Sequence, residues 1–195
     1  MKEKIKLLPI FLMQPIPYFG EKLNGEWIVE PKIDGWRLQI IKYEDGRIEY
    51  WGRRLEKHPN WTKNLSYLNP SLKDIPNGTL LDCELYSTKG RRGIPSVLTR
   101  TKKAEPLIFV FDIIFLNNEF LGNKPLRERK RILELLKLNP PIYLIEYKKL
   151  ENLEESLKEN LEKGYEGIVL KNLDSPYIIS KEAPIATHYW RKMKG

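Results

Sequence analysis

One lysine in this 195-residue chain has neighbours that suit a nucleophilic amine. Lys32 precedes an Asp-Gly pair, Arg37 follows five residues on, and strand-like segments lie on both sides. A lysine attacks only as the neutral amine, so nearby cations or desolvation must favour that form. Arg37 can supply a cation and can also hold a phosphate through paired hydrogen bonds. The local pattern alone also fits a β-turn with surface charges around it.

Two glutamates and two further lysines form a second group of candidates. Glu84 and Glu166 each follow a turn and begin or lie within a strand-like segment. Carboxylates are hard oxygen ligands that suit Mg²⁺ or Mn²⁺, which would neutralise triphosphate charge and polarise the α-phosphorus. Lys192 and Lys194 are two apart on a predicted strand, so they share one face and can both point into a cleft. Exposed strand-end glutamates and a solvated lysine tail are the alternatives.

Read in order, these residues belong to segments that resemble the motifs of the covalent nucleotidyltransferases, the superfamily of DNA ligases, RNA ligases and mRNA capping enzymes. Lys32-x-Asp34-Gly35-x-Arg37 resembles the first motif. The segment after Asp112, with its Pro-Leu and arginines, is similar to ATP-dependent DNA ligases in particular. The other matches are Trp51-Gly52-Arg53, Leu81-Asp82-Cys83-Glu84-Leu85 (usually Asp-Gly-Glu), Phe109-Val110-Phe111-Asp112, Glu166-Gly167-Ile168-Val169-Leu170-Lys171 and Lys192-Met193-Lys194.

The resemblance implies an adenylyltransferase that uses ATP with Mg²⁺ or Mn²⁺. It implies that Lys32 becomes bound to AMP, that Lys192 and Lys194 are catalytic cations, and that Glu30 recognises the adenine amino group. Phe111 is expected to stack on adenine, although Phe109 shares its strand face and remains an alternative. The implied nucleotide contacts are Glu30, Lys32, Arg37, Glu84, Phe111, Glu166, Lys192 and Lys194, and the implied metal ligands are Glu84 and Glu166.

Basic residues predict contacts to nucleic acid. Arg53 resembles the family's contact to the 5′-phosphate at a nick. The formal net charge of +8 and pI near 9.4 fit a nucleic-acid partner, and also fit a Lys/Glu-rich surface of the thermophile type. Each of the two basic clusters, one from Lys89 to Arg92 and one from Arg100 to Lys103, could instead be a solvent-exposed face without a ligand. The expected contacts are Arg37, Arg53, Arg91 and Arg92, with Lys89 in the same loop and a second cluster at Arg100, Lys102 and Lys103; Arg127, Arg129, Lys130 and Arg131 are expected on the exposed side of a helix.

The pattern of elements predicts an α+β fold with antiparallel sheets flanked by helices around a nucleotide cleft. By resemblance this is the ligase nucleotidyltransferase fold, which is similar to ATP-grasp. An Asp-Gly pair at 45–46 predicts a hairpin turn, and residues 69–78 read as a loop. The expected strands are 25–33, 36–44, 47–52, 80–86, 106–117, 166–172 and 188–195, and the expected helices are 125–138 and 151–164.

The sequence predicts one domain over residues 1–195, without a C-terminal OB-fold and without an N-terminal DNA-binding domain. The expected partners are nicked duplex DNA or RNA ends, with an OB-fold or DNA-binding partner in trans. A monomer in the cytoplasm, in a nucleoid or viral context, is expected, without a membrane span. The single cysteine, Cys83, excludes an internal disulfide and is expected to be a buried structural residue. An RNA ligase, a non-catalytic binding module and a GTP-using capping enzyme are the alternative functions.

Overall fold

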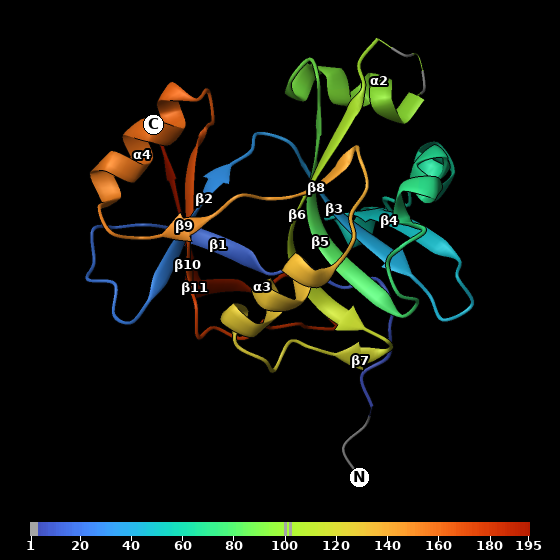
Figure 1. The fold of residues 1–195 in the computed structure, drawn as a ribbon, viewed down its shortest axis with the longest axis horizontal. Coiled ribbons are helices and arrows are strands. Elements are labelled where there is room, and N and C mark those ends of the chain that lie inside the picture. The colour runs from blue at the N-terminus through green and yellow to red at the C-terminus, as the bar shows by residue number, and fades with distance from the viewer. Residues whose placement is uncertain (1–3, 100, 102) are drawn as a thin grey trace.

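The computed structural model describes residues 4–99, 101 and 103–195, and these fold into two β-sheets with helices on their outer sides (Figure 1). The first sheet has the strand order β1-β11-β10-β2-β9. The second has the order β4-β3-β5-β6-β7, and β8 also pairs with β6. The first sheet contains β1 (Gln14–Pro17), β2 (Trp27–Lys32), β9 (Lys148–Lys149), β10 (Gly167–Asn172) and β11 (Ala186–Lys194). The second contains β3 (Trp36–Lys42), β4 (Ile48–Gly52), β5 (Thr79–Ser87), β6 (Pro106–Leu116), β7 (Glu119–Phe120) and β8 (Ile142–Leu144).

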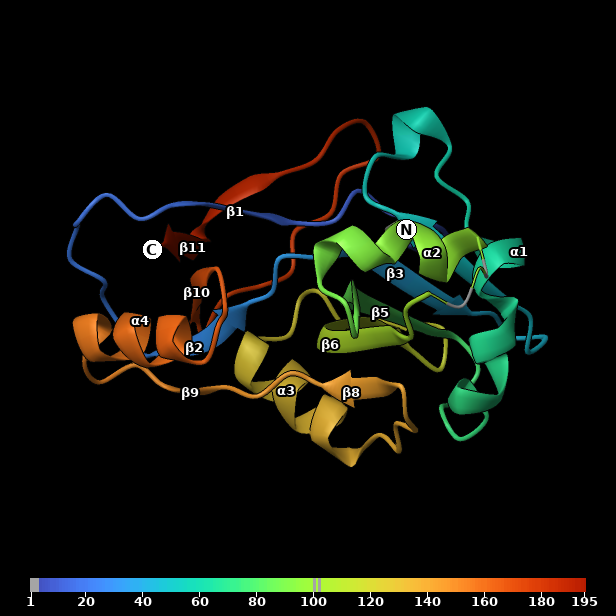
Figure 2. The ribbon, with the colours of Figure 1, turned by 90° about the horizontal axis from the view of Figure 1, so that it is seen from above.

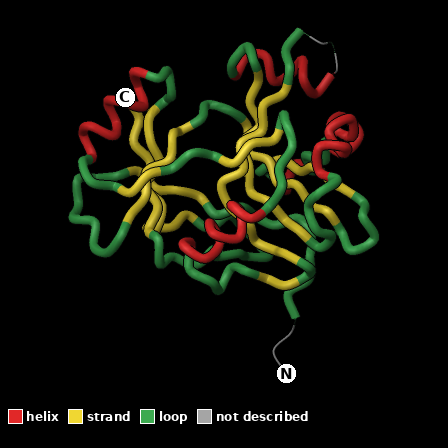
Figure 3. The backbone as a smooth tube through the Cα atoms, in the orientation of Figure 1, coloured by secondary structure: helices red, strands yellow, loops and turns green. Residues whose placement is uncertain are grey.

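The helices lie outside the strands (Figure 3). Helix α3 packs on β6 of the second sheet, whereas α4 packs on β10 of the first. The α-helices are α1 (Thr62–Leu65), α2 (Ile94–Thr99), α3 (Leu126–Leu135) and α4 (Leu153–Glu162), and the 3₁₀-helices are η1 (Leu55–Lys57), η2 (Ser66–Leu72) and η3 (Arg91–Gly93). No helix in the described ranges is long and apolar enough to cross a membrane.

The predicted α+β class is confirmed, although several details differ. Most neighbouring strands are antiparallel, but β1 pairs with β11 and β8 pairs with β6 in parallel. The hairpin between β3 and β4 closes as predicted, with the Tyr43 N–H donating to the Arg47 carbonyl over 2.8 Å. The prediction of a loop at 69–78 is wrong for its first residues, because η2 continues to Leu72. Its residues Leu68 and Leu72 are buried in the core.

Local capping explains how the helices begin and end. The Asn152 side chain accepts a hydrogen bond from the Glu155 N–H over 3.1 Å, which confirms the predicted start of α4. Helix α3 ends at Leu135 and not at 138, because the backbone of Leu136 is already extended. Pro125 stands just before this helix in extended conformation and not in its first turn.

The N-terminal segment joins the two sheets (Figure 2). Its strand β1 pairs with β11 of the first sheet. Just before that strand, the Ile10 backbone exchanges hydrogen bonds of 2.9 and 2.8 Å with the buried Gln39 side chain on β3. Met13 and Trp190 belong to the same apolar cluster as Phe111, so this core lies where the sheets meet. Cys83 is buried in the core of the second sheet, as predicted.

Candidate active site

A cleft of about 540 Å³ is lined by residues of both sheets. All of the residues predicted to contact nucleotide or metal line this cleft: Glu30, Lys32, Arg37, Glu84, Phe111, Glu166, Lys192 and Lys194. Arg53 and Arg91 also line it, whereas Arg92 is exposed on η3 and is not a lining residue. Arg100 and Lys102 of the second basic cluster lie outside the described residues.

Strand pairing places Lys32 and Lys194 in one cross-strand row. Gly167 on β10 pairs with Lys32 on one side and with Lys194 on the other. A Cβ atom on Gly167 would lie 1.9 Å from the Met193 carbonyl oxygen, so only glycine fits between these strands. The row two residues further along β10 joins Glu30, Val169 and Lys192. Alternation along the strands therefore gives the cations one common face.

Glu166 lies between the two lysines of the first row. Lys32 Nζ is 2.5 Å from Glu166 Oε2, and the Lys194 ammonium contacts Oε1 of the same carboxylate. Burial acts to raise the pKa of Glu166, but the hydrogen bonds from Lys194 and Lys32 outweigh it and the pKa is lowered. The bond to Glu166 raises the pKa of the exposed Lys194. The nucleophile candidate is thus held as one half of an ion pair.

Glu84 reaches the cleft from the second sheet. On β5 it pairs with Arg37 of β3 and Phe109 of β6, which fixes its position between two strands. Burial raises the pKa of Glu84 to about 7, while the charges of Arg37 and Lys32 oppose that rise. A Cβ atom on Gly35 would lie 2.3 Å from the Leu85 carbonyl oxygen, so the turn after Lys32 approaches β5 this closely only because residue 35 is glycine.

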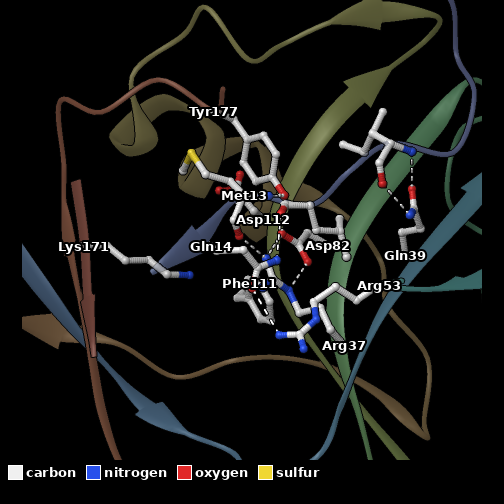
Figure 4. Close-up of polar contacts among 12 residues, drawn as sticks. Met13, Gln14, Arg37, Gln39, Arg53, Asp82, Phe111, Asp112, Lys171 and Tyr177 are labelled. Atoms are coloured by element: carbon white, nitrogen blue, oxygen red, sulfur yellow. Dashed lines mark hydrogen bonds and ion pairs between the residues drawn. The ribbon is translucent and has the colours of Figure 1, made fainter. Parts of the chain in front are cut away.

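Arg37 is held deep in the cleft wall (Figure 4). Its Nε and Nη2 atoms donate to the two carboxylate oxygens of the buried Asp82 over 2.7 and 2.6 Å, and Nη2 also donates to the Met13 carbonyl over 2.9 Å. Its guanidinium lies 4.9 Å from the centroid of the Phe111 ring. The Tyr177 hydroxyl donates to Asp82 over 2.6 Å, which ties a further segment to this pair. Arg37 is thereby held in place beside the ring of Phe111.

Phe111 is the aromatic residue of β6 that lines the cleft. Phe109 instead packs on Tyr143, with ring centroids 6.3 Å apart. The Lys171 ammonium lies 4.3 Å from the Phe111 centroid and 4.0 Å from that of Trp190. Burial lowers the pKa of Lys171 to about 8, although its ion pair with Glu30 opposes this. Of the two rings left open by the sequence, Phe111 is the one that lines the cleft, although it is only 8% exposed, and its stacking on adenine stays a prediction.

The basic helix α3 departs from the prediction. Arg129 and Lys130 were expected on its exposed side, but they are 0 and 1% exposed. Arg129 forms a two-pronged ion pair with the buried Asp112, and Lys130 contacts Glu30 and donates to the Phe111 carbonyl over 2.9 Å. The expectation is wrong for these two residues because buried carboxylates on the strands compensate their charge. It holds for the exposed Arg131.

Glu30 therefore has two buried cationic neighbours. Lys130 contacts its Oε1 atom, and Lys171 Nζ lies 2.6 Å from Oε2. Lys171 ends the segment Glu166–Lys171 that resembles a nucleotidyltransferase motif. Lys130 lies in the segment after Asp112, which resembles the corresponding segment of ATP-dependent DNA ligases. These two resemblances were the features of the sequence that could have pointed to Lys171 and Lys130.

Two basic residues at the cleft mouth, Arg53 and Arg91, differ in how tightly they are held. Arg53 Nη1 donates to Gln14 Oε1 over 3.3 Å. Arg91 Nη1 is 3.0 Å from Asp34 Oδ1 and donates to the Gly35 carbonyl over 2.7 Å, which links η3 to the turn after Lys32. More than half of the Arg91 side chain is exposed, so a phosphate can reach it.

A cleft between two sheets, with a lysine, opposed carboxylates and flanking lysines, defines a nucleotidyltransferase domain of the ligase type. The comparison with known families agrees: the chain belongs to the ATP-dependent DNA ligase domain family, whose model matches residues 12–194.

Relatives of known name support the same family. The chain is 34% identical over 181 residues to the SPbeta prophage-derived DNA ligase-like protein LigB of Bacillus subtilis, covering 89% of this chain and 63% of that protein. It is 33% identical over 198 residues to a probable DNA ligase of Persephonella marina, covering 91% of this chain and 33% of that protein. The chain thus spans less than two thirds of these relatives.

Solved structures show the same fold. A mycobacterial DNA ligase D complexed with ATP and MES superposes with a TM-score of 0.71 at 19% identity, covering 94% of this chain and 60% of that one. The ATP-dependent DNA ligase from bacteriophage T7 in complex with ATP gives 0.67 at 15% identity, covering 94% of this chain and 68% of that one. The predicted ligase nucleotidyltransferase fold is therefore confirmed.

Proposed function

We propose that this chain is the adenylation core of an ATP-dependent polynucleotide ligase that acts on nicked duplex DNA. The observation that carries the proposal is the row Lys32–Gly167–Lys194, which presents a lysine, the Glu166 carboxylate and a second cation to one cleft. Phe111 adds an aromatic side chain to the lining of the same cleft. This is the set of groups that a lysine attacking a nucleoside triphosphate needs.

In the first step, the Lys32 amine loses a proton and attacks the α-phosphorus of ATP. An N–P bond forms, the bond from phosphorus to pyrophosphate breaks, and AMP stays on Lys32. A 5′-phosphate oxygen at the strand break then takes the AMP and frees the lysine. Finally the 3′-hydroxyl attacks that 5′-phosphorus, closes the phosphodiester and releases AMP. Lys192 and Lys194 lie where they can stabilise the negative charge that develops at phosphorus.

The carboxylates fit Mg²⁺ or Mn²⁺ as the metal. Among residues 4–99, 101 and 103–195, no group of three or more histidine, cysteine, aspartate or glutamate side chains could hold a metal alone. Mg²⁺ characteristically takes one or two carboxylates and completes its shell with water and substrate phosphates. Glu166 and Glu84 supply such carboxylates on opposite walls of the cleft. A bound metal would neutralise triphosphate charge and polarise the α-phosphorus.

The mouth of the cleft supports nucleic acid as the second substrate. Arg53 and Arg91 lie at the entrance, Arg37 lies deeper, and Arg92 is exposed on the adjoining η3. Neutralisation of phosphates by these arginines would make binding weaken with salt. The proposal treats residues 1–195 as one adenylation domain. RNA ends are the alternative substrate, and a comparison of nicked DNA with nicked RNA duplexes decides between them.

Intact-protein mass spectrometry tests the proposal. The protein is incubated with Mg²⁺ and either ATP or GTP, and the modified peptide is mapped. An AMP adduct on Lys32, formed from ATP and not from GTP, is the expected result. Lys32→Ala should abolish the adduct, whereas Lys137→Ala, at a 72% exposed side chain, should keep it.

Either of two results would overturn the proposal or part of it. An adduct that survives Lys32→Ala would mean that another residue is the nucleophile. If no adduct forms, the next substrate is nicked DNA that already carries 5′-AMP. Failure to seal that substrate as well would favour a non-catalytic binding module.

A further inference from the structure

Two tryptophans in the cleft mouth have no place in the adenylation chemistry. Trp36 begins β3 directly after the turn that follows Lys32, and Trp61 precedes α1. Their ring centroids are 5.8 Å apart and their planes are tilted by 38°. Both rings line the cleft, and both are only partly buried against the core of the second sheet. One side of the pair is therefore packed, and the other is open to a ligand.

The backbone holds Trp61 firmly in this place. The Trp61 N–H donates to the Tyr50 carbonyl over 2.8 Å, and the Gly52 N–H donates to the Pro59 carbonyl over 2.8 Å. A Cβ atom on Gly52 would lie 2.8 Å from the six-membered ring of Trp61. The edge of the ring thus lies against the end of β4 in space that glycine leaves free. This pre-ordering lowers the entropy cost of binding against the ring.

Positive charge surrounds the two rings. Arg53, Arg54 and Lys57 come from the segment between β4 and Trp61, and Arg91 comes from η3; all four line the same cleft. Glu56 pairs with Arg54 over 3.0 Å and Asp34 pairs with Arg91 over 3.0 Å. The rim keeps an excess of cations over carboxylates. Aromatic faces among cations are the recurring features of sites that bind unstacked nucleotides.

We infer that Trp36 and Trp61 form a stacking platform for the nucleobase of a nucleotide that flanks the strand break. The inference rests on the proposed function: if Lys32 passes AMP to a terminal 5′-phosphate, the terminal nucleotide must enter this mouth. Its base then lies within reach of the rings, while the rim cations face its phosphates. The adenine of ATP has a separate aromatic partner at Phe111, so the two stacking sites serve different bases.

Removal of one base from the DNA tests the platform without altering the protein. Binding of the full chain is measured by fluorescence anisotropy in EDTA at low salt, so that no chemistry occurs. The probes are a 5′-phosphorylated nicked duplex and two versions with a tetrahydrofuran abasic residue, at the 5′-phosphate nucleotide or at the 3′-hydroxyl nucleotide. One of the two abasic probes should bind roughly 10-fold more weakly, as expected for one lost base–aromatic stack.

Variants then assign the loss to these rings. In Trp36→Leu and in Trp61→Leu, the intact and abasic probes should bind within about 2-fold of each other. Trp51→Leu is the matched control, because Trp51 is also a tryptophan of this region but packs against the apolar cluster of Met13, Phe111 and Trp190 and donates to Glu49. It should keep the full difference. Circular dichroism checks that each variant is folded.

Equal binding of all three probes by the unaltered protein would overturn the platform, and that result needs no variant to fold. A 10-fold difference that persists in both leucine variants would overturn it as well. Adduct formation on Lys32 needs no DNA, so mass spectrometry on the same preparations tells failure of the platform apart from failure of the proposed function.

Discussion

Lys130 offers the sharpest test of the buried charges beneath the cleft. It is 1% exposed and contacts Glu30, which is 2% exposed, and it also donates to the Phe111 carbonyl over 2.9 Å. Lys130→Met keeps most of the aliphatic volume but removes the charge. The Glu30 carboxylate would then keep Lys171 as a cationic partner, and the carbonyl of Phe111 would lose the hydrogen bond from Lys130.

The expected cost follows from that geometry. Loss of one partner of a buried ion pair destabilises a protein by about 3–5 kcal/mol, because the other charge stays buried and uncompensated. Lys171 compensates part of the Glu30 charge, which places the expected loss near the lower limit, at about 3 kcal/mol. Urea denaturation followed by tryptophan fluorescence measures the free energy of unfolding directly. Glu30→Gln combined with Lys130→Met should cost less than the two single changes together, because they break one interaction.

Arg131→Met is the control, since Arg131 is the next residue of α3 and is exposed. Its effect should stay within about 0.5 kcal/mol, as for most surface substitutions. Equal effects of the two substitutions would refute the burial of Lys130 and would restore the interpretation of this helix as a simple amphipathic one.

Three further predictions concern single side chains. Gly35→Ala places a Cβ 2.3 Å from the Leu85 carbonyl oxygen, so β5 must move, and we expect a loss of about 1–3 kcal/mol in unfolding free energy with slower adduct formation on Lys32. Unchanged stability would contradict this. Burial raises the pKa of Glu84 from its ordinary 4.5 to about 7, so the folded protein holds more protons than the unfolded chain between these values, and stability should fall as pH rises through that window. The change in unfolding free energy over this window is at most about 3 kcal/mol, and Glu84→Gln should remove it. Denaturation at a series of pH values from about 4.5 to 8 measures the change. Tyr177→Phe removes a hydroxyl that donates to Asp82 over 2.6 Å and accepts from the Met13 N–H over 3.0 Å. The free energy of unfolding should fall by about 1–3 kcal/mol. A thermal melt identical to that of the unaltered protein would refute these hydrogen bonds.

The sequence predicted the strands in which apolar residues recur regularly and the helices that have clear capping and terminating residues. The strand around Glu84 has apolar residues at every second position, the strand that ends at Lys32 is rich in apolar, β-branched and aromatic residues, and α4 has both a capping asparagine and a terminating glycine. The strands β8 and β9 were missed because they span only Ile142–Leu144 and Lys148–Lys149, too few residues for a period to show. The parallel pairing of β1 depends on contacts with the far end of the chain, which no local pattern encodes.

For α3, the sequence pattern gave a wrong prediction of which charged residues are buried. Arg129 and Lys130 look like surface residues because charged side chains are rarely buried without a partner. Their partners are Asp112 and Glu30, 17 and 100 residues away in the chain. Sequence separations of that size leave no trace in helical periodicity. The resemblance to the ligase family marked this helix, but it did not predict the burial of Arg129 and Lys130.

The charges of the cleft complete the physical argument for an anionic ligand. Glu166 is shared by Lys32 and Lys194, so the lysines are not matched one to one by carboxylates. Glu84, with a pKa near 7, carries only part of its charge at neutral pH. Lys192 adds a further cation to the same face. The free cleft therefore holds unbalanced positive charge behind a low-dielectric wall, where an incoming triphosphate is attracted more strongly than in water. Under the proposed function, a triphosphate that pairs with Lys194 would also draw the cation away from Glu166, and that carboxylate would become available to a metal ion as the substrate arrives.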